Sequence, residues 1–113
     1  MFNYCFLSGE VLTEPELKCF DNEAVTILEL GAMAGRDKAG VIKIACYKRL
    51  AVAAAKHIHQ GDYVSVMGYI WNLCETRERQ GKEGLEIIAL DMEFVRSDSH
   101  ILGPVFLDRE EED

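Results

Sequence analysis

Apolar and polar residues alternate along five segments of the chain, and this period of two is typical of β-strands. The clearest segment is Val41–Tyr47, in which Ile42, Ile44 and Cys46 point to one side. A second predicted strand breaks at a turn over Asp21-Asn22 and resumes over residues 24–31. Further strands are predicted over residues 3–12, 63–71 and 85–95. The pattern therefore predicts a mostly β protein.

One segment, between the third and fourth predicted strands, has a different period. Over Arg49–His59 the apolar residues Leu50, Ala54 and Ile58 recur every four positions, as in a helix, and Gly61 is placed to end it. One short helix between strands 3 and 4 of a five-stranded Greek-key barrel is the layout of the OB-fold, which commonly binds oligonucleotides. We therefore predict an all-β OB-fold, and its function has to be argued from its faces and loops.

The alternation also divides side chains between core and surface. The first strand is apolar on both faces, so we expect the face carrying Tyr4 and Phe6 to form an oligomer interface with a second copy of the chain. Cys5 and Cys46 fall among apolar strand residues and are predicted to be small buried hydrophobes. The residues of the last strand expected on the core side are Ile88, Leu90, Met92 and Phe94.

Length and composition exclude several classes of protein. The chain of 113 residues fits one domain, and no segment approaches the roughly 18 consecutive apolar residues of a membrane span. The first residues lack a basic stretch ahead of an apolar one, which argues against a secretory signal. None of the four cysteines forms a Cys-x-x-Cys pair. We therefore expect a cytoplasmic protein without a metal or cofactor.

The formal net charge of −8 is unevenly distributed. Residues 1–96 carry 14 acidic and 11 basic side chains, whereas residues 97–113 carry six acidic and one basic. We therefore predict an OB-fold domain over residues 1–97, followed by an acidic, flexible tail over residues 98–113. A nearly neutral barrel is compatible with a basic groove that binds nucleic acid.

Over about residues 3–95 the chain resembles the bacterial single-stranded DNA-binding protein family. The resemblance implies an OB-fold that forms dimers or tetramers and binds single-stranded DNA in replication, recombination or repair. The short length is most similar to the small members from cyanobacteria and plastids, which implies the nucleoid or the plastid stroma. The matching residues, in order, are Asn3, Gly9, Pro15-Glu16-Leu17, Leu50-Ala51, Gly61-Asp62, Val64, Val66, Gly68, Glu86-Ile87, Ala89 and Phe94-Val95.

The chain departs from this family at the aromatic positions that stack on bases. Tyr47 stands where the family has a phenylalanine, but Val41 and Glu75 stand where it has tryptophans, and the loop over residues 34–40 has no aromatic residue. The family's acidic tail ends in an apolar tip that binds partner proteins, whereas this tail ends in four acidic residues. We therefore expect weaker DNA binding than in the family.

Binding a single strand requires cations along the phosphate backbone and flat rings for the bases. Lys43 and Tyr47 share one face by strand parity, and Lys48 and Arg49 follow at its end, which makes this the strongest predicted patch. Further predicted binding residues are Tyr69 and Trp71 on the fourth strand, and Arg36, Lys38, Arg77, Arg79 and Lys82 in the loops.

Each of these groups has a structural alternative. Arg77, Arg79 and Lys82 alternate with glutamates and are equally explained by a solvated ladder of ion pairs. Tyr69 and Trp71 are equally explained as anchors of a subunit interface.

Two functions follow from these alternatives. The first is a homo-oligomer that binds single-stranded DNA and recruits replication or repair proteins through its tail. The second is an OB-fold interaction module that keeps oligomerisation and has lost strong nucleic-acid binding. We do not expect an enzyme, since the sequence contains no nucleophile–base set and no phosphate-binding loop.

Overall fold

The computed structural model describes residues 2–33, 39–72, 85–96 and 100–105. None of the helical residues within these ranges forms a segment long and apolar enough to cross a membrane. The elements, in chain order, are β1 (Cys5–Val11), β2 (Glu16–Phe20), β3 (Glu23–Met33), β4 (Ala39–Tyr47), α1 (Lys48–His57), β5 (Tyr63–Asn72), β6 (Leu85–Val95) and β7 (Ile101–Pro104).

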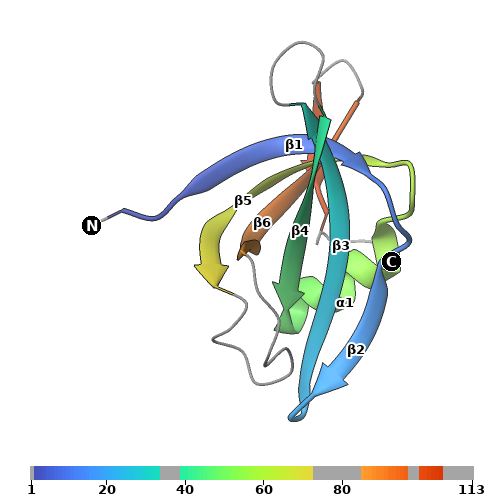
Figure 1. The fold of residues 1–113 in the computed structure, drawn as a ribbon. Coiled ribbons are helices and arrows are strands. Elements are labelled where there is room, and N and C mark those ends of the chain that lie inside the picture. Colours follow the sequence, from blue (N-terminus) through green and yellow to red (C-terminus); the bar gives the residue numbers. More distant parts are fainter. Residues whose placement is uncertain (1, 34–38, 73–84, 97–99, 106–113) are drawn as a thin grey trace.

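Five of the strands form a closed barrel in the order β1-β5-β6-β4-β3 (Figure 1). The barrel closes where β1 pairs with β3, with Glu10 opposite Gly31 and Val11 opposite Leu30. β4 and β6 run parallel, whereas the other neighbouring strands of the barrel run antiparallel. β2 pairs with β3 as a hairpin. The predicted OB-fold is confirmed, with α1 between the third and fourth barrel strands, β4 and β5.

Two glycines allow barrel strands to approach more closely than a side chain would permit. A Cβ at Gly9 of β1 would lie 2.0 Å from the carbonyl oxygen of Gly31 in β3. A Cβ at Gly68 of β5 would lie equally close to the carbonyl oxygen of Ile88 in β6. Both sites are close backbone approaches, which are a common reason for glycine inside a strand.

The core fills the barrel with the inward-facing residues of its strands, including Leu28, Leu30 and Ile44, all fully buried. The prediction for Cys46 is confirmed, because its thiol is buried 3.7 Å from the sulfur of Met92. Burial raises the pKa of Cys46 to about 12, because desolvation disfavours the thiolate. Cys46 is therefore an unreactive packing residue.

The helix α1 packs Ala51 and Ala54 into the core, and the hydroxyl of Thr26 in β3 donates a hydrogen bond of 2.7 Å to the carbonyl oxygen of Ala51. The predicted helix, Arg49–His59, is two residues too long at its end. The chain is already extended at Ile58 (φ −99°, ψ 135°), whose side chain enters the core. Gly61, at φ +98°, belongs to the turn that follows and does not terminate the helix.

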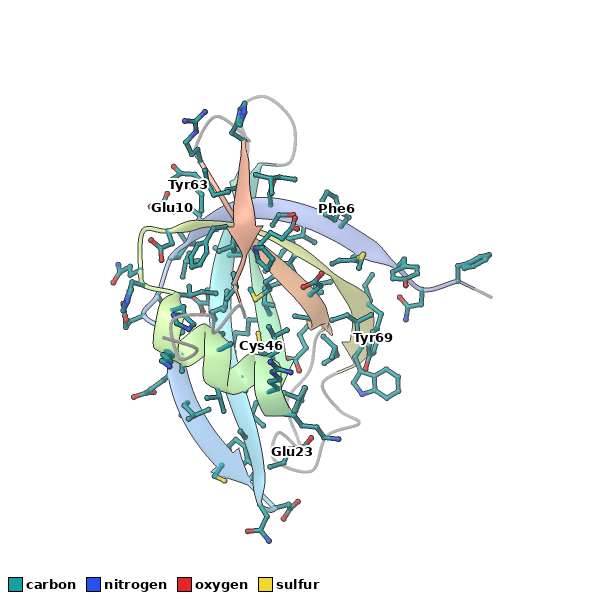
Figure 2. All side chains as sticks on the ribbon, turned by 180° about the vertical axis from the view of Figure 1, so that it is seen from behind. Phe6, Glu10, Glu23, Cys46, Tyr63 and Tyr69 are labelled. Atoms are coloured by element: carbon teal, nitrogen blue, oxygen red, sulfur yellow. The ribbon has the colours of Figure 1, made fainter. Side chains whose placement is uncertain are left out.

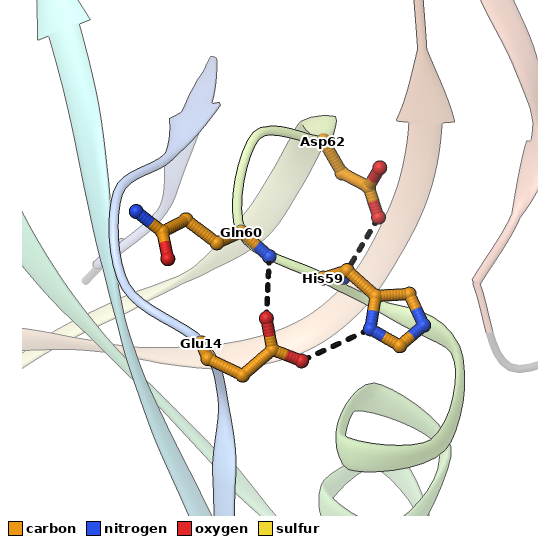
Figure 3. A network of polar contacts seen from close by, with 4 residues as sticks. All are labelled: Glu14, His59, Gln60 and Asp62. Carbon is orange, nitrogen blue, oxygen red and sulfur yellow. Dashed lines mark hydrogen bonds and ion pairs between the residues drawn. The ribbon is translucent and has the colours of Figure 1, made fainter.

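This turn is fastened to the loop between β1 and β2 by four polar residues (Figure 3). The backbone N–H of Gln60 donates to one carboxylate oxygen of Glu14, and the ring Nδ1 of His59 lies 2.9 Å from the other. The N–H of His59 donates to the carboxylate of Asp62. The hydrogen bond from Gln60 and then the contact with His59 lower the pKa of Glu14. The network fixes the chain as it leaves α1 for β5.

The predicted inward face of the last strand is wrong at Leu90. Met92 and Phe94 pack in or against the core as predicted, and Ile88 is buried, although it lies toward the outer side of β6. Between Met67 and Gly68 the register of β5 against β6 shifts by one residue, so that Leu90 is the extra residue of a β-bulge. Leu90 is 53% exposed, and Ile88 lies opposite Tyr69 on the outer face. The bulge changes which alternate residues of β6 point inward. Before the bulge the odd-numbered Ile87 lies in the core, and after it the even-numbered Met92 does.

The sheet continues into residues 98–113, the segment predicted to be a flexible tail. Ile101–Pro104 form β7, which pairs antiparallel with the end of β6. Val105 is buried, and its N–H donates to the carbonyl oxygen of Met92. This short apolar stretch therefore packs along β6. Residues 106–113, which hold the acidic end of the predicted tail, lie outside the described residues.

Candidate nucleic-acid interface

The register of the barrel brings residues of β4 and β5 together on its outer face. Tyr47 ends β4 and lies opposite Val25 of β3. Ala45 of β4 is in register with Ile88 of β6, and Ile88 lies opposite Tyr69 of β5. The buried Ile88 of β6 therefore forms a floor between the aromatic residues of β4 and β5.

Above this floor lies a groove of about 470 Å³, which we call the aromatic groove. Three of the predicted stacking residues, Tyr47, Tyr69 and Trp71, meet in it. Its volume falls within the range of small-ligand sites, roughly 300–1,000 Å³. The remaining lining residues are Glu23, Lys48, Leu50, Ile88, Ala89 and Leu90.

Tyr69 and Trp71 of β5 pack edge to face, with ring centroids 6.2 Å apart and planes at 90°. This arrangement is a favourable one for aromatic pairs and holds both rings in place. Trp71 remains 43% exposed, while Tyr69 and Tyr47 are half-buried. Figure 2 shows Tyr69 at the end of β5 that lies toward the groove. Anchored rings with accessible surface are suited to stacking on flat groups.

The cations predicted beside Tyr47 do not all line the aromatic groove. Lys48 lines the aromatic groove and has a left-handed backbone (φ 57°), which turns the chain from β4 into α1. Arg49 is exposed one residue further on. Lys43 shares the face of Tyr47, as predicted, but contributes to a separate hollow of about 260 Å³ and lies opposite Glu29. The other charged residues of that hollow are Glu14, Glu16 and Lys18.

The predicted loop cations Arg36, Lys38, Arg77, Arg79 and Lys82 lie outside the described residues. Sequence reasoning missed several residues that do line the groove. Glu23 could have been found from the sequence. It lies two residues before Val25, just after the Asp21-Asn22 turn, so its side chain points to the same side of β3 as that of Val25, which pairs with Tyr47. Leu90 could not have been found from the alternation of apolar and polar residues, since only the β-bulge turns its side chain outward.

A second exposed apolar surface lies on β1 and β5, and we call it the β1 face. Tyr4 and Phe6 are 67% and 71% exposed, and Phe6 lies opposite Met67 of β5. Figure 2 shows Phe6 on β1 and Tyr69 on the neighbouring strand β5. The predicted interface residues are therefore accessible, and they do not line the aromatic groove.

The fold and the two surfaces define an OB-fold barrel with an aromatic groove. The structure is similar to that of the single-stranded DNA binding protein from Thermus aquaticus, in both its wild-type form and a deletion mutant. Each comparison gives a TM-score of 0.67 at 22% sequence identity and covers 82% of this chain, but only 40% of the solved chain. No family model matches the sequence, and no curated protein matches it. The likeness establishes the OB-fold.

Proposed function

We propose that this chain binds single-stranded DNA in the aromatic groove, without recognising a particular sequence, and acts in DNA replication, recombination or repair. The observation that carries the proposal is the meeting of Tyr47, Tyr69 and Trp71 beside Lys48 in one accessible groove. Each base stacked on an aromatic ring contributes about 1–3 kcal/mol, whatever its identity. The similar structures are those of a single-stranded DNA binding protein from Thermus aquaticus, which supports the proposal.

Binding by a single copy of the chain is expected to be weak. Lys48 is the one cation among the described residues that line the groove, so phosphate contacts there are few. Assembly of several copies through Tyr4 and Phe6 would place several grooves on one strand and raise the avidity. Lys43, Arg49 and the loop cations extend the proposed phosphate contacts. The acidic end of the chain is the proposed site for recruiting replication or repair proteins.

A titration with oligo-dT, followed by tryptophan fluorescence, tests this function. Trp71 is the only tryptophan of the chain, so the signal reports on the groove itself. We expect saturable quenching that weakens as salt rises, with a slope of about −0.7 in log K against log salt for each phosphate contacted. An unchanged signal and no gel shift at low salt would contradict the proposal.

A second candidate is an interaction module that has lost strong DNA binding. The accessible apolar residues of the β1 face and the single lysine of the described groove favour it. The same titration separates the two candidates, because a module that only oligomerises leaves the fluorescence of Trp71 unchanged by DNA.

A further inference from the structure

A small hollow of about 230 Å³, which we call the acidic hollow, lies on the outer face of β1, β5 and β6. These three strands are neighbours in the sheet (Figure 1). The hollow is lined by Phe6, Ser65, Met67, Asp91, Met92 and Glu93. None of them lines the aromatic groove. The volume is below the roughly 300–1,000 Å³ of small-molecule sites, which suits the hollow to a single side chain.

The two carboxylates of the acidic hollow come from β6 and lie on its outer face. Asp91 is opposite Met67 of β5, and Glu93 is opposite Ser65. Both are half-buried, and no described residue forms an ion pair with either. One oxygen of Asp91 accepts a hydrogen bond of 2.9 Å from the N–H of Met92, which holds the carboxylate in place.

No basic side chain of the same face balances these charges. In the described parts of β1, β5 and β6, the outward positions around the hollow hold aromatic, serine, methionine and acidic residues, and no lysine, arginine or histidine. A third carboxylate, that of Glu10, lies on this face opposite Tyr63. Half-buried charges are stabilised by a cation, and here the cation has to come from another molecule.

The base of the hollow holds a hydroxyl that points to a polar ligand independently of the charges. Ser65 is only 5% exposed and lies between Val64 and Val66, which are fully buried in the core. Its side chain therefore faces the opposite side, where it lines the hollow. No other described residue forms a hydrogen bond with this hydroxyl. Because buried polar groups are normally hydrogen-bonded, Ser65 is a site for a polar group that enters the hollow.

The apolar wall of the hollow decides which cation fits. Phe6 is 71% exposed and Met67 is 37% exposed, so an aliphatic stem can lie along both of them. An arginine side chain has such a stem, and its guanidinium carries five N–H donors in a planar fork. Several acceptors at one place, together with an aromatic ring, favour arginine over the compact ammonium of lysine.

We propose that the acidic hollow binds an arginine side chain of a partner protein, with the guanidinium donating hydrogen bonds to Asp91, Glu93 and Ser65. A second copy of the chain does not fit this role. A two-fold contact would place this face against itself, so carboxylates would meet carboxylates. The inference goes beyond the proposed function and does not require DNA binding.

The test is a titration of the full chain, labelled with ¹⁵N, with the peptide acetyl-Leu-Arg-Leu-amide. We expect saturable shifts of the backbone amide signals of Ser65, Met67 and Glu93. The matched peptide has neutral citrulline in place of arginine, and we expect it to bind at least tenfold more weakly. Absence of shifts at these amides, or equal binding of the two peptides, would overturn the inference.

Variants separate the hollow from the general attraction of a cation to an acidic protein. Asp91→Asn combined with Glu93→Gln should weaken binding of the arginine peptide about tenfold, and Ser65→Ala about threefold. Asparagine at position 91 keeps an oxygen for the N–H of Met92. Glu16→Gln combined with Glu29→Gln is the matched control, because it removes two charges from the other hollow and should leave the affinity unchanged.

An equal loss of affinity in the two double variants would show attraction to the net charge of −8 alone and would overturn the inference. Unchanged amide signals outside the hollow report that each variant is folded. A chain that binds oligo-dT but not the arginine peptide would leave the proposed function standing without this inference. A chain that binds the arginine peptide but not oligo-dT would give the reverse result.

Discussion

Tyr47 combines a structural and a binding position in one residue. It ends β4 and is the N-cap of α1, although its side chain supplies no capping hydrogen bond. Its ring instead lines the aromatic groove, opposite the ring pair of Tyr69 and Trp71 across β6. The side chain therefore faces the groove, while the backbone at this position is fixed by the strand and the helix.

We expect Tyr47→Ala to weaken oligo-dT binding by about five- to a hundredfold, because a stacked base loses its ring. Tyr63→Ala is the matched control, since Tyr63 is a comparably exposed tyrosine of β5 that lies opposite Glu10 of β1 and does not line the groove. An equal loss of oligo-dT affinity in the two variants would show that Tyr47 does not stack on a base. Titration by fluorescence of Trp71 measures both.

At the scale of elements, the barrel depends on strands that approach each other at glycine and on loops that are tied together. Gly9 lets β1 cross β3 where the barrel closes. Glu14, in the loop between β1 and β2, binds His59 and Gln60 in the turn before β5. Both features hold together segments that are distant in sequence.

Replacing Gly9 by alanine is expected to destabilise the fold by about 3 kcal/mol, the upper end for overpacking. The new Cβ would meet the backbone oxygen of Gly31, which belongs to a paired strand and cannot move away easily. Gly40→Ala is the control, because a Cβ there meets nothing within 4 Å, and we expect a change within about 0.5 kcal/mol. Urea denaturation of both variants measures the difference, and similar midpoints would contradict the argument.

The Glu14 network predicts a dependence of stability on pH. Because folding lowers the pKa of Glu14 below its ordinary value of 4.5, its contribution is fully present above that value. The contribution is lost as pH falls through the lowered pKa of the folded state. We therefore expect Glu14→Gln to melt at a lower temperature than the wild type near neutral pH, with the gap closing as the pH falls below 4.5. A gap that stays constant with pH would show that the ionised carboxylate contributes nothing.

At the scale of the whole molecule, the two surfaces divide the proposed roles. The aromatic groove lies between β4 and β5 across β6, and the apolar β1 face lies on β1 and the neighbouring part of β5. Copies that assemble through the β1 face would each carry one groove. Several weak grooves could then act on one DNA strand.

Phe6→Glu combined with Tyr4→Glu is expected to convert the proposed oligomer into a monomer, because the contact would have to bury two charges without partners. Leu17→Glu is the control, since Leu17 is an exposed apolar residue of β2, away from the β1 face. Sedimentation velocity measures the mass of each. A wild-type protein that sediments as a monomer, or a double variant that remains oligomeric, would refute the role of the β1 face.

The amino-acid pattern by itself determined the strands, the helix and the side of the sheet on which the aromatic residues lie. Period-two alternation is a local property, so it placed Tyr47 with Lys43, and Tyr69 with Trp71, on their correct faces. The order of the strands and the single helix were sufficient to predict the OB-fold.

Tertiary structure alone decided which of these residues meet. Pairing register across β6 joined Tyr47 to Tyr69 and left Lys43 in a separate hollow beside Glu29. One extra residue at the bulge turned Leu90 outward, and long-range pairing with β6 added β7 to the sheet. The reason is that alternation encodes the face of each strand, whereas register, bulges and edge pairing depend on how distant strands pack together.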